Sequence, residues 1–380
     1  MEAVHRPAVV RVNLAAIQHN LRQIQLRHPR QQIYAVVKAN AYGHGAIEVA
    51  RAALSAGATG LCVAVLDEAI ELRQAGITTP IMVLGVTQPK WVSIAQQEQI
   101  ELTVPSLEWL DEAIDYINQN DSSMPLKIHL AMDTGMGRIG FRYLKEWSSI
   151  RNRLVNSKQV KLVGVFTHFA TADSEDTKQA NEQNERFKAM KQLIQQDDLF
   201  DAHDVLFHTN NSAASLWHPD FETDVIRLGI GLYGYNPSNG ELPLPYQLQP
   251  ALSLETEIAY IKQTQSGDTI SYGAEYASDQ PEWIATLPVG YADGYLREYK
   301  KGHVLIDGMR CPIVGRICMD QLMIKLPQPL PVGTPVVLIG ESQGETVSAI
   351  DLSHLSDTIA YEVLTVLGSR LPRVYEMNNY

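Results

Sequence analysis

Short runs of β-branched and other apolar residues alternate, from about residue 30 to residue 230, with segments whose apolar residues repeat at helical spacing. This alternation is typical of a parallel sheet with crossover helices. Segments such as AIEVARAALSAG and LDEAIELRQAG end in glycine, which suits the left-handed residue after a helix. The expected strands are IYAVVK, GLCVAV, PIMVLG, IELTV, LKIHLAM, KLVGVFTHF, DVLFHT and DVIRLGI. Eight such units predict a (β/α)8 barrel of the TIM type.

The pattern changes after the turn-rich stretch NPSNGELPLPYQLQP, residues 236–250. Strand-like runs then follow one another without long helices: SLETEIAYIKQ, EWIATLPVG, HVLIDG and PVVLIG. One helix is expected at VSAIDLSHLSD. The sequence therefore predicts an α/β chain with a barrel domain over 10–235 and a mainly-β domain over 236–380, with residues 1–9 packing on the second domain.

Composition narrows the possible partners. The 380 residues include 43 acidic and 31 basic side chains, giving a net charge of -12, which disfavours nucleic acids and anionic membranes. The start, MEAVHRPAVVRVNL, lacks a signal-peptide core, and no apolar run approaches the ~18 residues of a membrane span. Cys62, Cys311 and Cys318 indicate neither a disulfide framework nor a metal site. We therefore expect a cytoplasmic enzyme without a metal ion.

Candidate catalytic residues should lie where barrel strands end, because the carboxyl ends of the strands form the mouth of a barrel. Lys38 follows the first of these strands, between Val36, Val37 and Ala39. Partial desolvation there would lower the pKa of its amine and favour attack on a carbonyl carbon. By itself, a lysine at a strand end is more commonly a solvated surface residue.

Further polar residues follow the later strands. Arg138 lies in the glycine-rich turn DTGMGRIGF, and His168 lies in THFATAD. Ser212 in HTNNSAAS and Arg227, with Gly229 and Ile230, in RLGIGLYG would form a phosphate site from the last two βα units. An imine-forming lysine opposite a phosphate site suits pyridoxal 5′-phosphate, and a phosphate sugar is the competing ligand.

The motif VVKANAYGHG resembles the cofactor-lysine signature of the alanine racemase family. The resemblance continues in family order through DTGMGRIG, THFATAD, NSAAS, RLGIGLYG, ISYGAEY, GYADGY, GRICMD and YEVL, so it covers nearly the whole chain. It implies pyridoxal 5′-phosphate bound covalently to Lys38 and interconversion of L- and D-alanine by two bases, supplying D-alanine for peptidoglycan. It also implies a homodimer whose active sites are shared between chains.

The resemblance also assigns roles to single residues. Tyr272, from the partner chain, would be the base opposite Lys38, with Tyr272 serving L-alanine. Arg227 would face the pyridine nitrogen, His168 would link Arg227 to Tyr272, and Arg138 would support the phenolic oxygen and the substrate. The phosphate group would be held by Tyr42, Ser212, Gly229, Ile230 and Tyr361. The substrate site would include Met319 and Asp320, and the access corridor would include Tyr291 and Arg316.

One position departs from the common family pattern. Many members carry a carbamylated lysine two residues before the aspartate of DTGMGR, and this chain has Ala131 there. We expect an anion such as chloride, or a nearby side chain, to neutralise Arg138 instead. Three alternatives remain: a racemase of broader specificity that accepts serine, a non-catalytic pyridoxal phosphate carrier, and a decarboxylase. The long C-terminal domain argues against the carrier, and the absent glycine-run phosphate motif argues against the decarboxylase.

Overall fold

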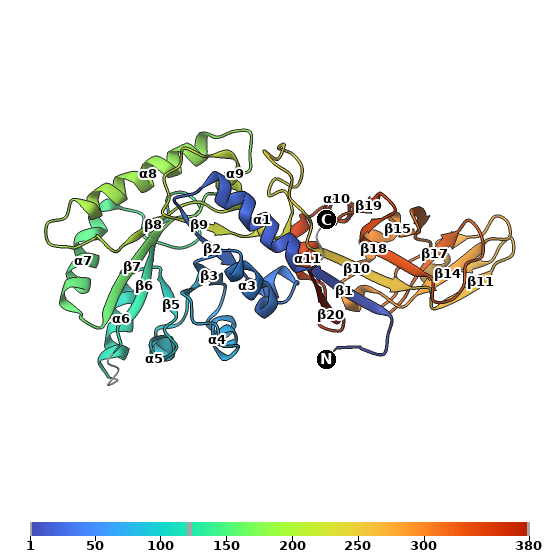
Figure 1. Cartoon of the computed structure of the whole chain (residues 1–380), viewed down its shortest axis with the longest axis horizontal. Coiled ribbons are helices and arrows are strands. Elements are labelled where there is room, and N and C mark those ends of the chain that lie inside the picture. The colour runs from blue at the N-terminus through green and yellow to red at the C-terminus, as the bar shows by residue number, and fades with distance from the viewer. Residues whose placement is uncertain (1, 120–123, 378–380) are drawn as a thin grey trace. The chain divides into compact units, whose positions relative to one another are not determined.

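The computed structural model describes residues 2–119 and 124–377 of the chain (Figure 1). These residues form two compact units. The C-terminal unit comprises Met1–Ala16, Tyr42–Gly45 and Gln249–Tyr380, and the barrel unit comprises Ile17–Ala41 and Ala46–Leu248. The domain limits expected from the sequence, 10–235 and 236–380, stay a prediction.

The barrel unit is built on an 8-stranded sheet in the order β8-β7-β6-β5-β4-β3-β2-β9, and every paired strand in it is parallel. Backbone hydrogen bonds from Arg227 to Asn210 and from Asp224 to Phe207 join β9 to the β8 segment and close the ring. The predicted barrel is therefore confirmed, and each predicted run contains a strand, although β2 and β7 each begin one residue before the run that predicted them. The strands are β2 (Gln32–Val36), β3 (Gly60–Val63), β4 (Ile81–Val83), β5 (Glu101–Val104), β6 (Leu126–Ala131), β7 (Val160–Phe166), β8 (Leu206–His208) and β9 (Val225–Leu228).

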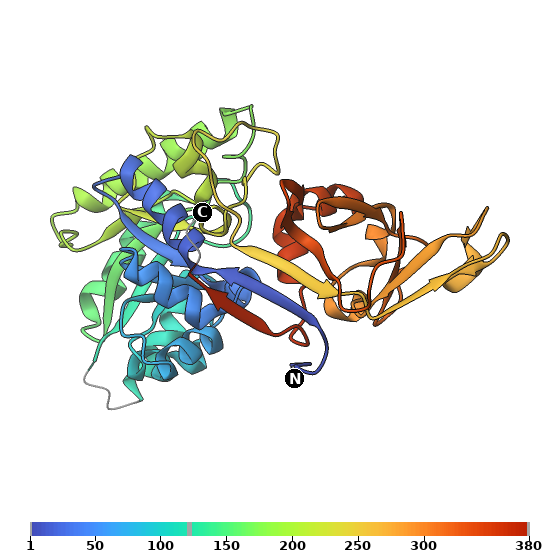
Figure 2. The ribbon, with the colours of Figure 1, turned by 45° about the vertical axis from the view of Figure 1, so that its right-hand side comes forward.

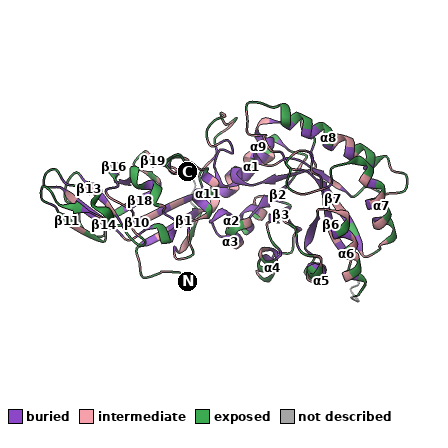
Figure 3. Ribbon diagram, turned by 180° about the vertical axis from the view of Figure 1, so that it is seen from behind, coloured by how far each residue is buried: buried purple, intermediate pink, exposed green. Residues whose placement is uncertain are grey.

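Helices surround this sheet, and their outward faces are exposed while the strands are buried (Figure 3). The expected glycine ends are confirmed, since Gly57 and Gly76 follow α3 and α4 with φ of 110° and 83°. No helix in the described ranges combines the length and apolarity needed to cross a membrane. The helices are α1 (Leu14–Arg27), α3 (Ala46–Ser55), α4 (Leu66–Gln74), α5 (Val92–Gln97), α6 (Leu107–Asn118), α7 (Trp147–Asn156), α8 (Lys178–Gln195) and α9 (Ser212–Trp217).

The C-terminal unit is mainly β, as predicted, and contains a 7-stranded, a 3-stranded and a 2-stranded sheet. Its largest sheet joins both ends of the chain: β1 pairs with β10 on one side and with β20 on the other (Figure 2). Ser348 caps the expected helix α10 by accepting a hydrogen bond from the Asp351 amide. The main strands are β1 (Ala8–Asn13), β10 (Leu252–Glu257), β11 (Tyr260–Gln263), β14 (Trp283–Leu287), β15 (His303–Ile306), β16 (Met309–Pro312), β17 (Leu322–Leu326), β18 (Pro335–Ser342) and β20 (Arg373–Glu376). The shorter elements are β12 (Thr269–Ile270), β13 (Tyr276–Ala277), β19 (Glu345–Val347), α10 (Ala349–Leu355) and α11 (Ala360–Thr365).

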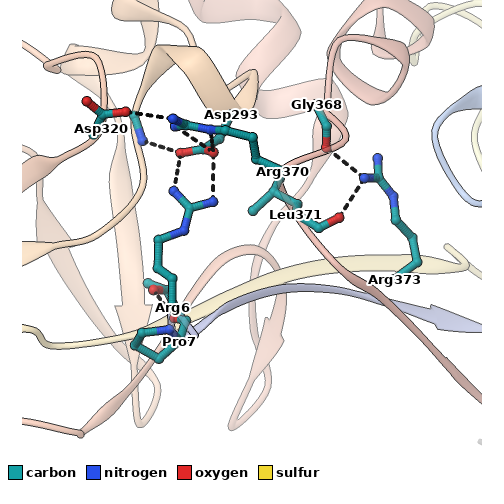
Figure 4. A network of polar contacts seen from close by, with 10 residues as sticks. Arg6, Pro7, Asp293, Asp320, Gly368, Arg370, Leu371 and Arg373 are labelled. Atoms are coloured by element: carbon teal, nitrogen blue, oxygen red, sulfur yellow. Dashed lines mark hydrogen bonds and ion pairs between the residues drawn. The ribbon is translucent and has the colours of Figure 1, made fainter. Parts of the chain in front are cut away.

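A buried carboxylate holds the loops of the C-terminal unit together (Figure 4). Asp293 is fully buried and accepts two hydrogen bonds from Arg6, at 2.8 and 2.7 Å, and one from Nε of Arg370 at 3.0 Å. Arg370 also pairs with Asp320 at 2.8 Å. Asp293 therefore ties the N-terminal segment to two distant loops, and the two arginines lower the pKa of its carboxyl group against the effect of burial.

Replacing Asp293 with alanine should lower the free energy of unfolding by about 2 to 3 kcal/mol, because Arg6 would lose its charge partner in a buried site. Urea unfolding of the full chain measures this loss. Asp320→Ala is the matched control, since Asp320 binds the same Arg370 but is largely exposed, and it should cost less than about 1 kcal/mol. Equal effects of the two substitutions would contradict the role assigned to Asp293.

Candidate functional site

Lys38 lies at the carboxyl end of β2, where the chain makes an unusual turn. The turn is α2 (Lys38–Tyr42), in which Ala39, Asn40 and Ala41 have φ of 51°, 52° and 53°. Left-handed backbone is costly for residues that carry a Cβ. Side chains hold it in place: Glu68 accepts from the Ala39 amide at 2.6 Å, and Asn40 accepts from the Ala46 amide at 2.9 Å. Strain of this kind is concentrated at functional sites.

Positive groups gather around Lys38 at the mouth of the barrel. Burial, followed by the charge of Arg138, lowers the pKa of the Lys38 amine. Burial, followed by the charges of Arg227, Arg138 and Lys38, lowers the pKa of His168 to about 3, so this imidazole is neutral at neutral pH. Among the described residues, Glu68 is the carboxylate whose charge acts on Lys38. Asp133, beside Arg138 in the sequence, pairs with Arg142 instead, at 2.8 Å. The cluster suits an anionic ligand.

Arg227 is buried inside the barrel and held by several acceptors. Its NH1 group donates to Nδ1 of His208 at 2.8 Å and to the His208 carbonyl at 3.0 Å. Its NH2 group donates to the carbonyls of Thr167 and Thr209 at 2.7 and 3.1 Å. The NH1 and NH2 groups of Arg227 thus both donate within the protein. The Nε–H group forms no hydrogen bond among the described residues, so it is left for a ligand. The expected contact with His168 is not among these bonds, and that link stays a prediction.

Three further residues of the barrel were missed by the sequence analysis. Nε2 of His208 forms a hydrogen bond with Nδ1 of His129 at 3.0 Å, and Nε2 of His129 forms one with Oε2 of Glu101 at 2.8 Å. All three residues are buried, at 4% exposure or less. A signal existed in the sequence, because the apolar strand runs IELTV, LKIHLAM and DVLFHT each contain an ionisable residue.

Ser212 joins the last two βα units, as the phosphate-site hypothesis requires. It is the first residue of α9, which Asn211 caps by accepting from the Ala214 amide at 2.9 Å. The Ser212 hydroxyl accepts from the amides of Gly229 and Gly231 at 2.9 and 3.2 Å, on the turn that follows β9. The structure therefore brings Ser212, Gly229 and Ile230 to one turn of the barrel unit.

The C-terminal unit carries the remaining candidates. Tyr272 is 68% exposed, on a turn where Ser271 and Gly273 have φ of 67° and 75°. Ser271 donates to the Arg316 carbonyl at 2.6 Å, and Arg316 forms an ion pair with Glu275. The turn therefore presents Tyr272 and Arg316 together, with the tyrosine ring open to solvent.

A second pair of loops presents Tyr291 and Met319. The Tyr291 amide donates to the Cys318 carbonyl at 3.1 Å, and the Ala292 amide donates to the Met319 carbonyl at 3.0 Å. Gly290 permits this approach, because a Cβ there would lie 2.4 Å from both carbonyl oxygens. Met319 and Tyr291 remain 53% and 37% exposed. In the same unit the rings of Tyr42 and Tyr361 lie 6.0 Å apart, so two predicted phosphate ligands are neighbours.

Comparison with known proteins gives consistent matches along the chain. The family model described as alanine racemase, N-terminal domain, matches residues 12–237, and the one described as alanine racemase, C-terminal domain, matches residues 251–375. An alanine racemase of Pediococcus pentosaceus is 46% identical over 376 residues, covering 99% of this chain and 98% of the relative. A crystal structure of alanine racemase from E. faecalis superposes with a TM-score of 0.93 at 42% identity, covering 99% and 100% of the two chains. A histidine racemase of Leuconostoc mesenteroides has a TM-score of 0.91 at 32% identity, covering 99% of each chain.

Proposed function

The chain belongs to the alanine racemase family, and from this premise we propose that it interconverts L- and D-alanine with Lys38 and Tyr272 as the two bases. The reaction is that of class EC 5.1.1.1, and the family uses pyridoxal 5′-phosphate. The observation that carries the proposal is the strained turn at Lys38, which sets an amine of lowered pKa among the cations of the barrel mouth.

The residues present fit the cofactor. A phosphate-bearing aldehyde needs a reactive amine, a hydroxyl and backbone donors for its phosphate, and positive charge nearby. Lys38, the Ser212 turn and Arg138 supply these groups within the barrel unit. We propose that Lys38 holds the aldehyde carbon covalently, that Tyr42, Ser212, Gly229, Ile230 and Tyr361 hold the phosphate, and that an anion such as chloride balances Arg138 beside Ala131.

The chain's own groups would then move protons at the α-carbon of alanine. When bound, the cofactor withdraws electrons from that carbon. Lys38, whose lowered pKa favours the neutral amine, would take or return the proton on one face, and Tyr272 would do so on the other. Arg227 would donate Nε–H to the pyridine nitrogen and keep it unprotonated, because a guanidinium does not give up its proton readily. Arg227 would thereby weaken the electron withdrawal that the cofactor supplies, and this would disfavour transamination.

We propose that the active enzyme is a homodimer in which Tyr272 of one chain faces Lys38 of the other. The exposure of Tyr272, Met319 and Tyr291 supports this, because a catalytic tyrosine open to water lacks the enclosed surroundings that proton transfer requires. Met319 and Asp320 would then line the partner's substrate site, and Tyr291 and Arg316 its access corridor. We also propose a cytoplasmic location, supported by the free thiols of Cys62, Cys311 and Cys318, and a supply of D-alanine for peptidoglycan.

Lys38→Ala should abolish covalent cofactor binding and racemisation in both directions. In the parent chain, borohydride reduction with pyridoxal 5′-phosphate should label a peptide that contains Lys38, which mass spectrometry identifies. Lys127→Ala serves as the control and should keep both the label and the activity. A borohydride-stable label retained by the Lys38→Ala chain would contradict the assignment.

Mixing Lys38→Ala chains with Tyr272→Phe chains, each inactive alone, should restore racemisation. Each mixed dimer would hold one site with both lesions and one with neither, so roughly a quarter of all sites should work at equal mixing. Chain exchange is verified by native mass spectrometry. If exchange is complete and no activity returns, Tyr272 acts in its own chain and the shared site is wrong.

A broader specificity is the second candidate, because a histidine racemase shares this fold over nearly the whole chain. Steady-state rates on L-alanine, L-serine and L-histidine separate the two functions. We expect kcat/KM for alanine to exceed that for histidine by at least about tenfold, since the bulky side chains of Met319 and Tyr361 would exclude substrates with more than a methyl or hydroxymethyl group. Comparable values for alanine and serine would favour the broader enzyme.

A further inference from the structure

The row of buried side chains from Arg227 to Glu101 has only one possible order of protons. Arginine has N–H donors and no acceptor, so Nδ1 of His208, 2.8 Å from NH1, must be unprotonated. A neutral His208 then carries its proton on Nε2 and donates to Nδ1 of His129 at 3.0 Å. His129 in turn carries its proton on Nε2 and donates to the Glu101 carboxylate at 2.8 Å. Every proton is displaced toward Glu101.

The barrel is shaped to hold this row. His129 on β6 and His208 on β8 are separated by β7, and they meet over Gly164 of that strand. A Cβ on Gly164 would lie 2.1 Å from Nδ1 of His129 and 3.1 Å from Nε2 of His208. Phe166 of β7 stacks on the His208 ring at 5.3 Å and also lies 5.4 Å from the Arg227 guanidinium. Strand β7 thus leaves space for the His129 ring at Gly164 and covers the His208 ring with Phe166.

We propose that Glu101 is a positioning residue for the racemisation: through His129 and His208 it is the counter-ion of Arg227, and it holds NH1 so that Nε–H points to the pyridine nitrogen. The proposal rests on the role of Arg227 proposed above. A buried guanidinium bound to neutral acceptors alone would keep an unbalanced charge. Two neutral imidazoles, with their N–H dipoles aligned between the guanidinium and Glu101, link the two charges without a carboxylate beside the cofactor.

Other groups act on the two ends of this row. Arg227 faces Cys62 on β3, His168 after β7 and Arg138 after β6, in addition to His208. Glu101 faces Tyr34, Cys62 and Arg73 in addition to His129. Arg73 is the rival counter-ion, but its guanidinium donates to the backbone carbonyls of residues 77, 79, 98 and 99 and forms no ion pair with Glu101 among the described residues.

A double-mutant cycle on the unfolding of the cofactor-free full chain tests the charge pairing. Glu101→Gln and Arg227→Met, separately and together, should be non-additive: the equilibrium constant of the double variant should differ from the product of the single effects by roughly threefold or more. The cycle of Glu101→Gln with Arg73→Met should be additive within about twofold. Additivity of Glu101 with Arg227, or stronger coupling to Arg73, would overturn the proposal.

Nitrogen NMR of the parent chain tests the proton order without any substitution. His129 and His208 should both be neutral Nε2–H tautomers at neutral pH. A cationic ring, or a proton on Nδ1 of either residue, would refute the order.

Catalysis gives a third readout. A carboxylate raises the pKa of a cation paired with it, so Glu101→Gln should move the alkaline limit of kcat to lower pH and reduce kcat by about tenfold. Glu282→Gln, which removes a comparably buried carboxylate from the C-terminal unit, should match the parent profile. A Glu101→Gln profile equal to that of the parent would overturn the positioning role. If the parent chain itself fails to racemise alanine, the proposed function fails instead. The double-mutant cycle and the NMR experiment still test the pairing of Glu101 with Arg227 and the order of protons between them.

Discussion

A buried positive charge is the constraint on which the barrel's chemistry depends. Burial lowers the pKa of Arg227 to about 10, which still leaves the guanidinium charged at neutral pH. A charged group in an apolar barrel needs its donors satisfied and its charge balanced. Backbone carbonyls, His208 and the row that ends at Glu101 meet this need. The charge of Arg138 acts on both cationic groups, and after burial it helps to lower the pKa of Arg227 and the pKa of the Lys38 amine.

Lys38, the proposed reactive lysine, is placed by a second constraint, in the backbone. Consecutive left-handed residues after β2 turn the chain sharply at Lys38. The contacts that hold this turn come from Glu68 at the start of α4 and from Asn40 within the turn itself. Rigid positioning of an amine at a strand end is what separates a catalytic lysine from a solvated surface lysine. The turn therefore supports the proposed role of Lys38 over that of a solvated surface lysine.

The C-terminal unit solves a different problem, which is to present exposed groups on stiff loops. Asp293 holds the Tyr291 turn in place through its hydrogen bonds with Arg6 and Arg370. Gly290 lets that turn approach the Met319 loop. Ser271 and Glu275 fix the Tyr272 turn against Arg316. Side chains that remain exposed on such loops suit a surface completed by another chain, whereas flexible loops would lose entropy on assembly.

The sequence by itself determined the class of fold, the strand runs of the barrel, the glycine ends of α3 and α4, and the capped helix at Ser348. These features follow from local periodicity and turn chemistry, which neighbouring residues carry. Motif matches also identified the positions of Lys38, Ser212 and Tyr272. Only the tertiary structure decided the left-handed turn, the pairing of β1 with β20, and the row from Arg227 to Glu101. Those features join residues far apart in the chain. The role of His129 within an apolar strand depends on its contacts with Gly164 and His208, which only the closed barrel brings beside it.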